Sequence, residues 1–264
     1  MAAINFSSLT PPYPGLGSRR HFLGAPFDCF AKEAVIDLIG GSGATSHFRY
    51  LVTPNVDHVV RLKNNHELYE YYQAAWMSLC DSRPIAALAH LRSLRLPLVT
   101  GSDLTAVLFA SVIKKGDLVT LIAANKNVVR DMKAAFPTVH FRAIIPPQGV
   151  WNDSAALNSC IDFVVHAEAR FVFIAIGSPQ SEKIAFELSR HPEARGVGFC
   201  VGASLEFLVG SKKRAPLWMR HSGLEWLHRL ASDPKRLWRR YFGAVVPLVG
   251  LFFEELLGRP RRHG

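Results

Sequence analysis

Residues 170–176 read RFVFIAI, and they are followed by GSPQ at 177–180 and by SEKIAFELSR at 181–190. The first segment is a continuous apolar run, which is typical of a strand covered on both faces. The last segment has the apolar spacing of an amphipathic helix. A buried strand that leads through a short turn into a helix is the repeating unit of an α/β fold with a parallel sheet.

The same alternation extends over most of the chain from residue 19. Capping residues such as Ser102 and Asn127 are expected to begin two of the helices. The fold class is therefore α/β, with a mainly parallel sheet flanked by helices. Further strands are expected at 47–52, 77–80, 96–99, 117–123, 139–145 and 197–201, and helices at 57–73, 84–92, 103–115, 127–136 and 154–165.

Three expected strands end in small or polar residues directly before a helix. These ends read TPN at 53–55, CDS at 80–82 and GSPQ at 177–180. Turn chemistry alone also selects such residues. Ligands of open α/β sheets nevertheless bind outside the carboxyl ends of the strands, so three such ends in one sheet favour a binding site there.

The positive charge of the chain lies near its carboxyl terminus. The 264 residues have a formal net charge of +10, and residues 211–264 contain twelve Lys or Arg against four Asp or Glu. Leucines and tryptophans alternate with arginines between 224 and 240, which predicts a basic amphipathic helix for a membrane surface or a partner. An ordinary solvated helix face remains the alternative.

Other patterns exclude several classes of protein. Four cysteines lie far apart without a CxxC pair, which argues against a disulfide scaffold or a structural zinc site. The GGSG at 40–43 follows a helical stretch and is interpreted as a turn, not as a dinucleotide-binding loop. No Asp-x-Asp is present, so helix amino termini and Arg or Lys are expected to meet the charge of a nucleotide diphosphate without a metal ion.

The composition divides the chain into three parts. Residues 1–18 are expected to be a flexible leader without a secretory signal, 19–210 the α/β domain, and 211–264 a basic appendage. The longest apolar run, 242–253, is too short to span a bilayer. We therefore expect a cytosolic protein that rests on a membrane.

Several motifs occur in an order that resembles one protein family. They are TPN at 53–55, LCD at 79–81, VTGSDL at 99–104, GSPQSE at 177–182, GASLEF at 202–207, RAP at 214–216 and GLEWLHRL at 223–230. Together they look like the WecG/TagA/CpsF family of bacterial glycosyltransferases. The resemblance covers residues 22–241, and the last block is its most specific part.

The resemblance implies that residues 19–210 form the Rossmann-like catalytic domain of an inverting glycosyltransferase. It also implies a cytoplasmic enzyme that associates peripherally with the inner face of the plasma membrane. Such an enzyme moves a hexose or N-acetylhexosamine from a UDP-sugar to a saccharide on polyprenyl diphosphate, in exopolysaccharide or other surface-polysaccharide biosynthesis. The implied partners are these two substrates and an anionic membrane surface, with no cofactor, metal or nucleic acid, and a homo-oligomer stays open. A non-catalytic family member, or a basic module that binds nucleic acid or membrane, is the alternative.

The resemblance also assigns roles to residues. Asp81 matches the family's acid and is the expected catalytic base, although a helix N-cap is the alternative role for it. Where the family has Asp-Gly, Lys-Gln and Phe-Asp-Phe, this chain has Asp81-Ser82, Gln180-Ser181 and Leu205-Glu206-Phe207, so the identity of the sugar stays open. The expected substrate-binding residues are Thr53, Asn55, Gln180, Ser181, Glu206, Arg214, Arg229 and Arg236.

Overall fold

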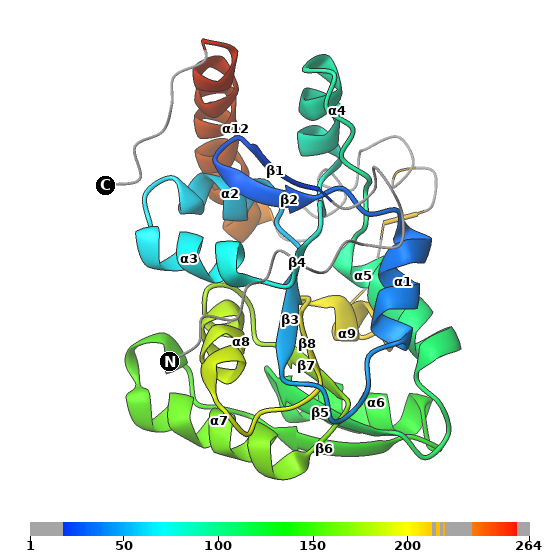
Figure 1. Ribbon diagram of the computed structural model, residues 1–264. Helices are drawn as coiled ribbons and strands as arrows, with labels where there is room; N and C mark the ends of the chain where they lie inside the picture. The colour runs from blue at the N-terminus through cyan, green and yellow to red at the C-terminus, as the bar shows by residue number, and fades with distance from the viewer. Residues whose placement is uncertain (1–17, 213–214, 217–218, 220–233, 258–264) are drawn as a thin grey trace.

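The computed structural model describes residues 18–212, 215–216, 219 and 234–257 (Figure 1). Its centre is a six-stranded sheet in the order β4-β3-β8-β7-β5-β6, and every pair of neighbouring strands is parallel. The expected Rossmann-like α/β fold is confirmed. The strands are β3 (Arg49–Val52), β4 (Met77–Ser78), β5 (Leu118–Ala123), β6 (His140–Ile144), β7 (Phe171–Ala175) and β8 (Val197–Cys200).

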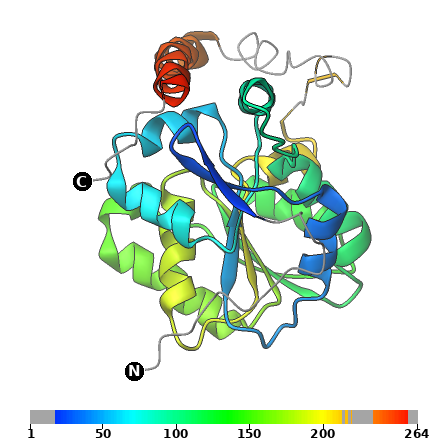
Figure 2. The same ribbon diagram turned by 45° about the horizontal axis from the view of Figure 1, so that its top comes forward.

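Helices cover both faces of this sheet, as Figures 1 and 2 show. Side chains of α3 (His66–Ala74), α7 (Ser154–Ala167) and α8 (Gln180–Arg190) pack with one face. Those of α1 (Lys32–Gly40), α5 (Gly101–Val107), the π-helical turn η2 (Leu108–Val112), α6 (Lys126–Ala135) and α9 (Ser204–Leu208) pack with the other. The remaining helices are α2 (Val56–Leu62), α4 (Arg83–Leu91), η3 (Val150–Asn152) and α12 (Pro234–Leu256).

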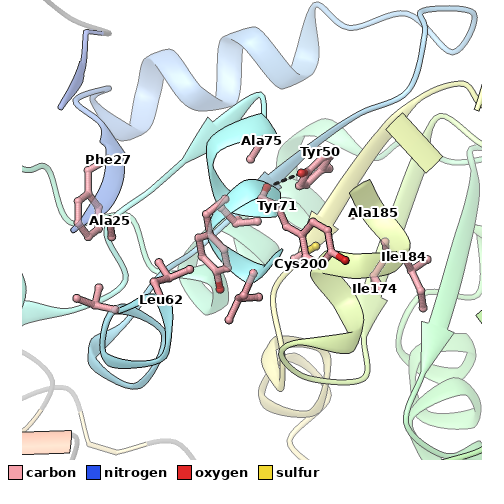
Figure 3. Close-up of a cluster of buried hydrophobic side chains, with 14 of the residues drawn as sticks. Ala25, Phe27, Tyr50, Leu62, Tyr71, Ala75, Ile174, Ile184, Ala185 and Cys200 are labelled. Carbon is pink, nitrogen blue, oxygen red and sulfur yellow. Dashed lines mark hydrogen bonds between the residues drawn. The ribbon is translucent and has the colours of Figure 1, made fainter. Parts of the chain in front are cut away.

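The alternation of side chains along a strand explains the apolar runs. Phe171 and Phe173 of β7 point into the core on one side of the sheet, and Val172 and Ile174 point into the core on the other. All four are fully buried. On the second of these sides, the hydroxyl of Tyr50 donates a hydrogen bond to the carbonyl oxygen of Tyr71, joining β3 to α3 (Figure 3).

Some of the expected elements are wrong in detail. The expected helix 57–73 is two helices, because Asn65 begins α3 by accepting a hydrogen bond from the backbone N–H of Leu68 at 2.9 Å. The segment 96–99 is not a strand and makes only an isolated bridge between Leu98 and Cys80. The caps of α5 and α6 are Thr100 and Asn125, each two residues before the caps expected from the sequence.

An antiparallel hairpin precedes the sheet and was not predicted. It consists of β1 (Arg19–Phe22) and β2 (Ala25–Asp28). The guanidinium of Arg19 donates to both carboxylate oxygens of Asp28, at 3.0 and 2.7 Å, and the same carboxylate accepts from the backbone N–H of Ser78 in β4 at 2.7 Å. A buried carboxylate thus joins the hairpin to the edge of the sheet.

The helix α12 packs against α2. Leu248 and Leu251 are buried in the core cluster that also contains Leu62. Two carboxylates of its last turns bind this side as well: Glu254 pairs with Lys63 at 2.6 Å, and Glu255 accepts from the N–H of Leu23 at 3.3 Å. Among the described residues, no helix has the length and apolar character needed to cross a bilayer.

Candidate functional site

The carboxyl ends of four neighbouring strands meet at one edge of the sheet. Because β4, β3, β8 and β7 are adjacent and parallel, the segments that follow them lie side by side. These segments include all three strand ends that the sequence analysis selected, together with residues 201–204 after β8. We call this region the carboxyl edge.

Asp81 lies at this edge and is half-buried. Its backbone N–H donates to the carbonyl oxygen of Pro54 at 3.1 Å, and its Oδ2 accepts from the backbone N–H of Gly101, at the start of α5, at 3.3 Å. Asp81 is not the cap of the following helix, since Ser82 performs that role by accepting from Ile85 N–H at 3.4 Å. The N-cap role considered for Asp81 is therefore wrong. One contact fixes its backbone and the other its carboxylate.

Thr53 lies in a tight junction between three segments. It is buried, and its hydroxyl is 3.5 Å from the carbonyl oxygen of Cys200 at the end of β8. A methyl group at Gly101 would come within 3.1 Å of Thr53 Oγ1 and 3.2 Å of Ser204 Oγ. Only glycine lets the start of α5 approach the ends of β3 and β8 this closely without displacing a hydroxyl group.

The sequence analysis did not select three residues of this junction. They are Gly101, Ser102 and Ser204, and the two serine hydroxyls lie 3.4 Å apart. Ser204 also donates to the carbonyl oxygen of Val201 at 2.6 Å. The sequence did contain a sign of these residues, since they are the small residues of the segments TGSD and GASL. Those segments were quoted only as motifs of the resemblance.

Asn55 caps α2 at the same edge. Its side-chain oxygen accepts from the backbone N–H groups of Asp57 and His58, at 3.1 and 3.4 Å. The group that Asn55 can offer to a sugar hydroxyl is therefore its amide NH₂.

Gln180 and Ser181 begin α8 but differ in exposure. Gln180 is half-buried, whereas Ser181 is only 1% exposed. The carbonyl oxygen of Ser181 faces inward and accepts from the thiol of Cys200 at 3.4 Å. Of these two candidates, Gln180 has the exposure needed to touch a ligand.

A buried carboxyl lies beneath this turn. Glu182 is 3% exposed, and Tyr72 of α3 donates its hydroxyl to Glu182 Oε1 at 3.0 Å. Burial raises the pKa of the Glu182 carboxyl, and the hydrogen bond from Tyr72 and the positive charge of Arg61 offset only part of this effect. The hydrogen bond between Tyr72 and Glu182 links α3 to the first turn of α8, two residues after Gln180.

The raised pKa of Glu182 predicts a pH-dependent stability. The folded state holds the proton more tightly than the unfolded chain, so this carboxyl stabilises the fold at low pH. We expect its contribution to fall as the pH rises above its ordinary pKa value of 4.5. Chemical denaturation of the wild type and of Glu182→Gln across this range should show the decline only with the glutamate.

Glu193, an exposed glutamate on the loop after α8, provides the matched control for that measurement. Glu193→Gln should keep the wild-type dependence of the free energy of unfolding on pH. If Glu182→Gln also kept it, the buried carboxyl would not be the titrating group.

Of the candidates in the carboxyl-terminal part, the structure describes the side chain of Glu206 but not those of the arginines. Glu206 lies on α9, and its Oε2 pairs with Lys212 Nζ at 2.5 Å. A carboxylate can accept several hydrogen bonds, so its second oxygen can still serve a ribose hydroxyl. Arg214 and Arg229 lie outside the described residues, and for Arg236 in α12 only the backbone belongs to them.

Two surface depressions lie elsewhere. One, of about 500 Å³, is lined by β6 and α7 residues such as Ile144 and Asp162, and the other, of about 520 Å³, by residues such as Asp37 and Arg170. Neither contains a residue selected as a site candidate. The candidate site is therefore identified by converging strand ends and their polar side chains. In the part of the chain that the structure describes, no group of three or more His, Cys, Asp or Glu side chains could hold a metal ion.

The comparison with known protein families gives a match over most of the chain. The sequence model described as "Glycosyl transferase WecG/TagA/CpsF family" matches residues 20–262. The match spans the whole sheet, the carboxyl edge and α12.

Proposed function

Since the chain belongs to the glycosyl transferase WecG/TagA/CpsF family, we propose that it is an inverting enzyme that uses Asp81 as its base. The acceptor is a saccharide on polyprenyl diphosphate, and the donor is a UDP-linked hexose or N-acetylhexosamine. The product is an intermediate of exopolysaccharide or other surface-polysaccharide biosynthesis. Family membership supports glycosyl transfer itself, and the arrangement of the carboxyl edge supports Asp81 as the base.

The observation that carries the proposal is the position of Asp81. Its carboxylate is held by the Gly101 N–H at 3.3 Å, at the edge where α/β sheets bind their ligands. In an inverting transfer the acceptor hydroxyl attacks the anomeric carbon as the bond from this carbon to the UDP oxygen breaks. Asp81 accepts the hydroxyl proton, and UDP leaves with the bonding electron pair.

The polar residues around Asp81 fit the binding of a sugar nucleotide. Asn55 and Gln180 follow β3 and β7, and they supply amide groups for sugar hydroxyls. Thr53 is buried beside Asn55, and it reaches the sugar only through the small part of its side chain that stays exposed. Glu206 on α9 supplies a carboxylate for the ribose. Arg214, Arg229 and Arg236 of the appendage, residues 211–264, neutralise the diphosphate charge. The side chain of Ser181 is buried, so Ser181 contributes by packing the first turn of α8, which carries Gln180.

The experiment that tests the proposal combines the full chain with a panel of UDP-sugars and a short-chain polyprenyl-diphosphate saccharide. One donor should give a product extended by one sugar, with the anomeric configuration opposite to that of the donor. A product of retained configuration would contradict the single-step mechanism. The absence of product with every donor would favour a non-catalytic family member.

A further inference from the structure

Most of the large exposed apolar side chains of the described residues belong to α4 and to α12 with the residue after it. Among the described residues, the large hydrophobic side chains that are exposed lie at the end of α4, on α12, directly after α12, and at Ile145. Figures 1 and 2 show the carboxyl ends of α4 and α12 projecting from the same end of the molecule. That end is also the one toward which the carboxyl edge of the sheet faces.

The helix α12 has two apolar faces. Leu248 and Leu251 face α2 and are buried. The residues Val246, Val249, Phe253 and Leu256 recur at helical spacing on the opposite side and are 44–71% exposed. Because Glu254 and Glu255 bind Lys63 and the Leu23 N–H, the acidic groups of the last turns are engaged away from this exposed face.

The end of α4 combines an exposed leucine with two arginines. Ile85 and Ala89 are buried, whereas Leu91, at the last turn of the helix, is 71% exposed. Arg92 and Arg95 follow it, and both are exposed. Neither guanidinium makes an ion pair or hydrogen bond with any residue that the structure describes.

A defined turn fixes the direction of this tip. Leu94 N–H donates to the carbonyl oxygen of Ala89 at 3.0 Å, and Ser93 N–H donates to that of His90 at 3.0 Å. This is the Schellman pattern that ends a helix, and Ser93 adopts the left-handed conformation it requires, with φ +55°. Leu94 packs against the core, so the turn is anchored while Leu91 points outward.

We propose that the tip of α4, residues 90–95, is a second membrane contact, in which Leu91 enters the lipid interface while Arg92 and Arg95 bind anionic headgroups. This inference rests on the proposed function, whose acceptor is carried by a membrane lipid, and it adds a contact to the appendage, residues 211–264, for which the sequence predicts membrane association. The chemistry is that of interfacial anchors, which combine a buried apolar side chain with nearby cations. With the exposed apolar face of α12 as the other contact, the tip of α4 would orient the protein so that the carboxyl edge faces the bilayer that carries the acceptor.

The test measures the binding of the full-length chain to sedimenting vesicles. Arg92→Gln with Arg95→Gln should lower partition onto phosphatidylglycerol-containing vesicles by roughly 30-fold, about fivefold for each arginine, and change little on neutral phosphatidylcholine. Leu91→Ser should lower partition on both vesicle types by about fivefold to tenfold. The arginine contribution should also weaken with added salt, because exposed charges are screened.

Matched controls lie on other parts of the surface. Ile145→Ser removes an exposed apolar side chain directly after β6, the edge strand at the other side of the sheet from β4. Lys126→Gln with Lys133→Gln removes two exposed charges from α6. Both should bind vesicles like the wild type. Phe253→Ser on α12 should weaken binding independently of the α4 variants. All variants change exposed side chains, so their melting temperatures should stay near that of the wild type.

Other outcomes would overturn the inference in distinguishable ways. Wild-type partition in the α4 variants, with loss only in Phe253→Ser, would leave α12 as the membrane contact and remove α4. Loss of self-association in the α4 variants, measured without vesicles by sedimentation, would make the tip an interface between copies. Failure of the wild type to bind either vesicle would overturn both membrane contacts. Transfer to a soluble short-chain acceptor does not need the tip, so its absence in the wild type would refute the proposed activity separately.

Discussion

Replacing Asp81 with asparagine should lower the rate of sugar transfer by about 10²–10⁴-fold, the usual contribution of a positioned base. The substitution preserves the shape of the side chain. The amide oxygen can still accept from the Gly101 N–H, which lies 3.3 Å from Oδ2 in the wild type. What the amide cannot do is take the proton of the acceptor hydroxyl at neutral pH.

The expected signature is a fall in kcat with little change in the donor KM. Because the side chain is half-buried and keeps its backbone contact, the circular dichroism spectrum and the melting temperature should stay near those of the wild type. The matched control is Asp153→Asn, which changes the cap of α7, after the opposite edge strand β6. Asparagine caps helices about as well as aspartate, so this variant should transfer normally. Full activity of Asp81→Asn would remove Asp81 from the mechanism.

The strands of the sheet were predictable because burial on both faces leaves a direct mark on the sequence. The apolar run at 170–176 corresponds to β7 for this reason, and the expected segments at 117–123 and 197–201 contain β5 and β8. The same signal failed at 96–99. Leu96 and Val99 are buried, but they pack beside the sheet without a ladder of hydrogen bonds. Apolar content reports burial and not strand pairing.

The amino-terminal hairpin could not be predicted from local patterns. Its strands have four residues each and contain charged side chains and Pro26. It is held by contacts some fifty residues away in the sequence: Asp28 accepts from Ser78 N–H in β4, and Arg19 donates to the carbonyl oxygens of Gln73 and Ala75. A contact of this range leaves no periodicity that a sequence window could detect.

The candidate site was predictable in part for a topological reason. Thr53, Asp81 and Gln180 each follow a strand, and any parallel sheet brings such positions to one edge. Gly101 and Ser204 depend on which strands are neighbours. Ser204 meets Thr53 and Gly101 only because β8 lies beside β3, although about 145 residues separate these strands in the sequence. Strand order of this kind cannot be read from one turn at a time.

Gly196→Ala should destabilise the fold by about 4 kcal/mol or more, at the upper end of single-substitution effects. Gly196 lies where the chain enters β8, with φ +93°. Its N–H donates to Ser46 at 3.0 Å, and its carbonyl oxygen accepts from Arg49 N–H at 3.2 Å, so it fixes β8 beside β3. A methyl group would lie 2.5 Å from the carbonyl oxygen of Ala169 and 2.7 Å from that of Arg170. Both atoms are backbone, and neither can move without displacing β7.

Gly116→Ala is the control that separates this collision from backbone strain. Gly116 has a similar φ of +88°, but an added methyl group there meets nothing within 4 Å. The control should cost only the roughly 1–2 kcal/mol of a left-handed conformation. Chemical denaturation of both variants gives the comparison, and equal losses would show that the close approach at Gly196 is not a constraint. A larger loss of stability in Gly196→Ala, together with lost transfer in the protein that still folds, would link activity to the alignment of β8 with β3. That alignment brings Ser204 close to Thr53 at the other end of the same two strands.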